Sequence, residues 1–129
     1  MKHYRLGLLV VLLCSGCDPA ATLLLRAQVP SAEEAKSFAV AELKAQRFEP
    51  RHHQDAEPTC SYMWRNQTQS TYPRASWTTY ADVCASETAL RVRLSDYPRF
   101  TLSPETAQLR DHMKKTLTQR FNGIDVVVQ

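Results

Sequence analysis

The chain has 129 residues, of which 16 are basic and 13 acidic, so its formal net charge at pH 7 is +3. This length allows one hydrophobic core of modest size and excludes a second domain. The four cysteines and three glycines are few enough to be considered one by one.

The first 17 residues have the order of a bacterial export signal. Lys2 and Arg5 are positive, residues 6–13 are apolar, and the small pair at 15–16 precedes Cys17. This arrangement resembles a lipoprotein signal peptide with its lipobox. The resemblance implies that residues 1–16 are cleaved and that Cys17 carries a diacylglyceryl thioether and an N-acyl group such as palmitate. The mature protein is then anchored in a membrane without spanning it.

A transmembrane helix is the alternative interpretation of this segment, and its length disfavours it. Crossing a bilayer core takes about 20 apolar residues, whereas the apolar run ends at residue 14. Extending the run would bury Asp18 and Pro19 in lipid, where a carboxylate and a helix-breaking residue are costly. Asp18 follows Cys17 directly, as in the inner-membrane retention signal of enterobacterial lipoproteins, so the periplasmic face of the inner membrane is slightly favoured.

Cleavage changes the composition of the protein. Removing 16 of the 129 residues leaves 113, with 14 basic residues against 13 acidic ones and a formal charge of +1. This balance disfavours a nucleic-acid partner. Gly7 and Gly16 leave with the signal, so Gly123 is the only glycine of the mature sequence. Glycine-rich phosphate loops and dinucleotide-binding motifs are therefore excluded.

The cysteines agree with export to an oxidising compartment. Cys14 leaves with the signal and Cys17 is acylated, so Cys60 and Cys84 remain. Two thiols in a periplasmic protein predict a disulfide bond. Their spacing does not match the C-x-x-C pattern of redox enzymes.

Residues 17–30 contain two prolines and are expected to form a lipidated tether, with the leucines at 23–25 lying against the membrane or the domain. The folded domain is expected over 31–129. Ser31 and Glu34 form a capping-box pattern that begins a helix over about 32–47. The apolar side of this helix consists of Ala32, Ala35, Ala39 and Leu43.

A proline-bounded loop is expected over 49–58, followed by strands at 60–66, 75–84 and 88–95. If the first two strands form a hairpin centred on Tyr72, the numbers of paired residues sum to 144, which places Cys60 opposite Cys84. Trp64 and Tyr80 then lie on the same face as the disulfide. The pattern leaves open which face of the hairpin is buried.

Ser103 and Pro104 begin a second helix, whose apolar stripe ends near Phe121. A terminal strand follows over 124–128, and it could pair with either edge of the sheet. The predicted order is α-β-β-β-α-β. Burying both helices on one side of the strands gives an α+β fold in two layers, with an antiparallel sheet of about four strands.

The sequence contains few candidates for a catalytic or metal site. His52, His53 and Asp55 are possible metal ligands, but adjacent side chains rarely converge on one ion and His112 lies elsewhere in the sequence. No serine or cysteine stands in a motif typical of a catalytic nucleophile. The cysteines are assigned to acylation and to a disulfide bond, and the serine and threonine residues fit helix caps, turns and strands. We therefore expect no metal, no cofactor and no enzymatic activity.

The remaining candidate is a surface. Arg91 and Arg93 alternate with apolar residues on one strand and should face solvent, and Arg65 and Trp64 could lie near them. Arginine and tryptophan are enriched in protein-binding hot spots. A solvated sheet face is the alternative interpretation of the same residues.

These features predict a membrane-anchored periplasmic lipoprotein that acts as a non-enzymatic protein-binding or envelope-assembly module. Its partner would be an envelope protein or an exported protein. The alternative function is an inhibitor or immunity-type protein directed against an exported toxin or a wall-degrading enzyme.

Overall fold

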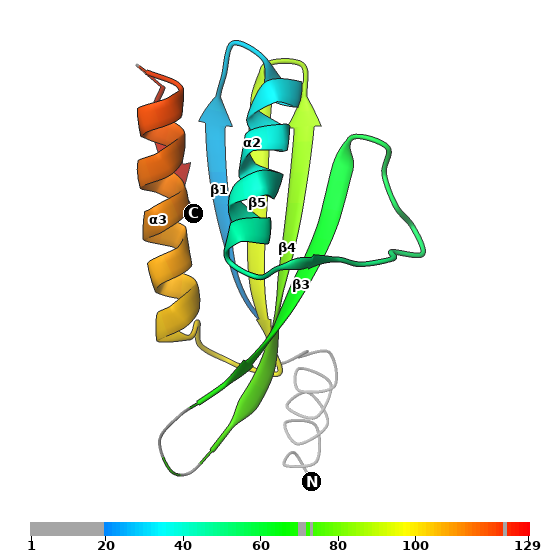
Figure 1. Cartoon of the computed structure of the whole chain (residues 1–129), viewed down its shortest axis with the longest axis vertical. Coiled ribbons are helices and arrows are strands. Elements are labelled where there is room, and N and C mark those ends of the chain that lie inside the picture. Colours follow the sequence, from blue (N-terminus) through cyan, green and yellow to red (C-terminus); the bar gives the residue numbers. More distant parts are fainter. Residues whose placement is uncertain (1–19, 70–71, 73, 123) are drawn as a thin grey trace, which may run out of the picture.

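A computed structural model of the chain describes residues 20–69, 72, 74–122 and 124–129. Two helices cover one face of a six-stranded sheet, which confirms the two-layer α+β class (Figure 1). The sheet order is β2-β3-β4-β5-β1-β6 and every neighbouring pair is antiparallel. The elements are β1 (Ala21–Gln28), α2 (Ala32–Ala45), β2 (Glu49–Pro50), β3 (Cys60–Thr68), β4 (Ser76–Ser86), β5 (Ala89–Tyr97), α3 (Pro104–Arg120) and β6 (Val126–Val128).

Strand β1 corrects the predicted tether over 17–30. It lies inside the sheet between β5 and β6, so the folded domain begins near residue 20 and not at residue 31. Leu23 and Leu25 point into the core, whereas Leu24 between them lies on the other face. Three consecutive leucines therefore hide the period-two alternation of a strand. The predicted signal and Cys17 lie outside the described residues.

Helix α2 begins as predicted. The Ser31 side chain accepts a hydrogen bond from the Glu34 amide at 3.3 Å, which satisfies one of the free N–H groups of the first turn. The Glu34 carboxylate does not complete a capping box but pairs with Arg120 of α3 at 2.9 Å. Ala35 and Ala39 are fully buried, and their small side chains let the helix lie close to the sheet.

The hairpin of β3 and β4 has the predicted register. Cys60 pairs with Cys84 and Trp64 with Tyr80, and the two cysteines form the predicted disulfide. Met63, on the opposite side of β3, is buried in the core. The helix-facing side is therefore the core side, and the disulfide lies on the outer side of the sheet.

The structure has six strands where the sequence predicts about four, because two strands were missed. Strand β1 lies in the segment predicted as a tether, and β2 is a two-residue pairing at the start of the predicted loop. Strand β5 continues through Asp96 and Tyr97, two residues beyond the predicted end at residue 95. The terminal strand β6 pairs with β1, a neighbour that the prediction lacked.

Asp96 extends β5 because its carboxylate is satisfied inside the protein. It is fully buried and accepts hydrogen bonds from the hydroxyls of Thr79 and Thr106, each at 2.7 Å. It also accepts from the Ser103 amide at 2.8 Å. Ser103 is the N-cap of α3, so this network attaches the start of α3 to β4 and β5.

In the part of the chain that the structure describes, neither helix has the length and apolar character needed to span a bilayer.

Candidate protein-binding surface

The side of the sheet opposite the helices carries three exposed arginines on two adjacent strands. We call this surface the arginine face and define it by Arg26 of β1 and Arg91 and Arg93 of β5. Arg26 is paired directly with Arg91, and Leu24 with Arg93. Among the described residues, none of the three arginines has a carboxylate within ion-pair distance.

The positive charge of this face is not neutralised by the neighbouring strand. Asp82 of β4 is paired in register with Arg93, but its carboxylate binds Arg51 at 3.1 Å. Like charges placed directly opposite each other on a sheet destabilise the pair. Arg26 and Arg91 thus form an unfavourable contact within the isolated domain. Glu57 lines the same hollow as Arg91 and Arg93, and Asp125 lines the hollow that contains Arg26.

An aromatic surface adjoins the arginine face on β3 and β4. The Arg51 guanidinium lies 5.5 Å from the ring centroid of Tyr62 and 4.7 Å from that of Tyr80. The imidazole of His53 stacks on Tyr62 at 4.3 Å between centroids. These contacts hold the segment after β2 against the sheet.

The predicted metal-ligand candidates have structural contacts in this segment. His53 Nδ1 accepts a hydrogen bond from the Asp55 amide at 3.2 Å, and His52 is exposed. His112 lies on α3, where it bonds Glu42 of α2 at 3.0 Å. No group of three histidine, cysteine, aspartate or glutamate side chains that could hold a metal ion occurs within the described ranges.

Two hollows adjoin on the arginine face, and Arg91 lines both. The smaller, of about 180 Å³, also contains Arg93, the disulfide and Tyr62. The larger, of about 410 Å³, contains Arg26 and Val127. Planar guanidinium groups bind carboxylates with two parallel hydrogen bonds. The face therefore has the shape and charge to receive acidic side chains from another protein.

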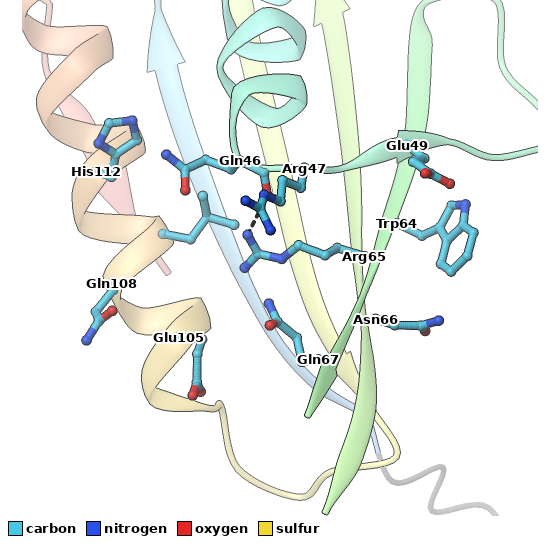
Figure 2. A pocket seen from close by; sticks show the side chains of 11 residues that line it. Gln46, Arg47, Glu49, Trp64, Arg65, Asn66, Gln67, Glu105, Gln108 and His112 are labelled. Carbon is cyan, nitrogen blue, oxygen red and sulfur yellow. Dashed lines mark hydrogen bonds between the residues drawn. The ribbon is translucent and has the colours of Figure 1, made fainter. Parts of the chain in front are cut away.

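The structure brings together only part of the predicted site. Arg91, Arg93 and Trp64 share the outer side of the sheet, with Trp64 and Arg93 on strands separated by β4. Arg65 does not belong to this surface. Side chains alternate between the two faces of a strand, so Arg65 points to the helix side, whereas Trp64 points away from it (Figure 2).

Arg65 lies instead in a cleft of about 700 Å³ between β3, α3 and the end of α2 (Figure 2). It donates a hydrogen bond to the Gln46 carbonyl at 2.6 Å and its guanidinium lies 4.6 Å from the Phe48 ring centroid. When the side-chain amide of Gln67 is oriented with its oxygen toward Arg65, this oxygen accepts a hydrogen bond from Arg65 Nε at 2.6 Å. Burial lowers the pKa of the Arg65 guanidinium, while the Asp96 and Glu105 carboxylates act in the opposite direction. Arg65 therefore connects β3 to α2 and is committed within the fold.

Arg26 is the member of the arginine face that sequence reasoning missed. It lies in the segment predicted as a tether, where no partner strand was expected. The available signal was the alternation of apolar Leu25 and Ala27 with polar Arg26 and Gln28. Once this segment is read as a strand, Arg26 falls on the face opposite Leu25.

Comparison of the chain with protein-family models, with curated proteins and with solved structures gives no match.

Proposed function

We propose that the protein is a lipid-anchored protein of the cell envelope that binds an acidic protein partner through the arginine face. The observation that carries this proposal is the direct pairing of Arg26 with Arg91. Two cations opposed in this way weaken the sheet slightly. A carboxylate placed between them by a partner replaces the repulsion with two attractions.

Arg93 extends the same charge along β5. Its cross-strand neighbour Asp82 is held by Arg51, itself packed against two tyrosines. The guanidinium of Arg93 thus remains available to bind a carboxylate of a partner protein. Complementary charge at an interface speeds association and selects the partner. Non-enzymatic binding at the periplasmic face of a membrane is the activity that this combination supports best.

The test uses a photo-crosslinking residue in place of Val127. This side chain is 47% exposed and lies beside Arg26. We expect an adduct with one envelope or exported protein in cells of the native host. The double variant Arg91→Glu/Arg93→Glu should reduce this adduct by about tenfold, because charge reversal opposes like charges across the contact.

The matched control is Lys114→Glu/Lys115→Glu, which reverses two exposed charges on α3 on the helix side of the protein. It should leave the adduct unchanged. Equal adduct in both double variants, at equal abundance of folded protein, would contradict the proposal that the arginine face binds the partner.

A further inference from the structure

The end of the domain where the chain enters β1 carries exposed aromatic side chains. Phe100 is 82% exposed and Tyr97 is 46% exposed. Both lie in or next to the connection between β5 and α3, at the same end of the sheet as Ala20, which forms a bridge with Arg99. The hairpin of β3 and β4 extends toward this end as well (Figure 1).

The backbone of this connection is held by the fold, so the exposure of Phe100 follows from the structure. The Arg99 guanidinium lies 4.7 Å from the ring centroid of buried Trp77, and its Nε donates to the Thr101 carbonyl at 3.1 Å. The Ser103 amide is fixed by Asp96. Phe100 lies between these two attachments.

The distance from the proposed lipid anchor to this end is short. Two residues lie between Cys17 and Ala20, and the three Cα–Cα steps that join them span at most roughly 11 Å when fully extended. A domain of about 110 residues has a radius of gyration of about 13 Å. The tether is thus shorter than the radius of the domain that it holds, and the end containing Ala20 must stay close to the bilayer.

We propose that this end rests on the bilayer, with Phe100 and Tyr97 entering the headgroup region. The proposal rests on the proposed acylation of Cys17. Tyrosine is enriched at membrane–water interfaces, where its ring is buried and its hydroxyl group stays in water. Phenylalanine is among the apolar side chains that interfacial segments insert into the boundary between headgroups and acyl chains. Together with the acyl chains they give a second membrane contact, which fixes the orientation of the domain.

This orientation has a consequence for the arginine face. Strand β1 leads away from Ala20, so the sheet stands on the membrane, with the end at Gln28 and Thr88 about 25 Å farther from it. The arginine face then points sideways, parallel to the membrane plane. It is presented to proteins embedded in or attached to the same membrane.

The test places a fluorescent indole at each end of the sheet in the full, processed chain. The variants Phe100→Trp and Thr88→Trp are reconstituted in vesicles of phosphatidylethanolamine and phosphatidylglycerol with brominated acyl chains, which quench nearby indoles. The fluorescence that each variant adds to the parent chain is measured. We expect about threefold stronger quenching at position 100 than at position 88, since interfacial groups penetrate only about 5–10 Å.

Mass spectrometry and vesicle flotation of the same samples separate the two proposals. Both sites are exposed, and circular dichroism confirms that the variants retain the parent fold. Acylated, floating protein with equal quenching at both positions would overturn the proposed orientation and leave the anchor intact. A chain that carries no lipid at Cys17 would overturn the anchor and the orientation together. Quenching confined to position 100 in acylated protein supports both.

Discussion

Asp96 of β5 accepts a hydrogen bond from the backbone amide of Ser103, the N-cap of α3, although both residues are completely buried. The same carboxylate binds two threonine hydroxyls. We expect Asp96→Asn to lower the free energy of unfolding by about 2–3 kcal/mol. The new NH2 group can only donate hydrogen bonds, and the groups that surround it in the wild type are donors too, so buried donors are left without acceptors. Urea denaturation measures this loss.

The control for this prediction is Asp125→Asn, which changes an exposed carboxylate close to β6. Surface substitutions usually change stability by less than about 0.5 kcal/mol. Equal stabilities of the two variants would mean that the Asp96 network does not hold α3 to the sheet.

Arg91→Glu is predicted to stabilise the isolated domain. The new carboxylate would lie opposite Arg26 on β1 and turn a repulsive cross-strand pair into an attractive one, with a gain of about 0.5 kcal/mol. Urea denaturation at low and high salt is the measurement, and the gain should shrink as salt screens the pair. A loss of stability would show that Arg26 and Arg91 do not repel each other in solution.

The disulfide between Cys60 and Cys84 should be present in the purified mature protein. Mass spectrometry without reductant should find a species two hydrogens lighter than the dithiol form. The double variant Cys60→Ser/Cys84→Ser should lose about 3 kcal/mol of stability, the amount expected for a loop of this length. Two alkylatable thiols in the native protein would contradict this prediction.

Cys17→Ser should abolish lipidation of the protein. The variant is expected in the soluble fraction or as uncleaved precursor, because no thiol remains to accept a diacylglyceryl group. Metabolic labelling with palmitate checks the result. Label that persists in the variant would contradict lipidation at Cys17.

Metal removal should have no effect on stability. His53 is occupied by its stacking on Tyr62 and its bond from the Asp55 amide, and these contacts need no ion. The melting temperature should be the same with and without a chelator, and His52→Ala should leave it unchanged. A fall in melting temperature on chelation would indicate a metal site.

The register of the hairpin could be predicted from residue numbers because the Cys60–Cys84 bond and the centre at Tyr72 give the same pairing. The buried face could not, since Trp64 and Trp77 place large aromatic rings on both sides of the hairpin. Tertiary contacts decide it, with Met63 packed under α2 and α3. Arg65 could have been separated from Trp64 by strand alternation alone.

Strand β1 was harder to predict for a physical reason. Its period-two pattern is interrupted by Leu24, which lies on the outer face beside Arg93. Its pairing partners, β5 and β6, are distant in the sequence and leave no local signal. The arginine face could not be predicted in full without this strand, because Arg26 belongs to it.

The position of β1 also determines when the protein can fold. This strand pairs with β5 and with β6. The first strand of the sheet in chain order therefore has both of its neighbours in the second half of the chain. Contacts between distant parts of a chain slow folding, because a long loop must close before any stabilisation is gained. If the chain is exported with its N-terminus first, as the proposed lipoprotein signal implies, β1 crosses the membrane before both of its partner strands. The sheet is then completed only after Val126–Val128 has crossed as well.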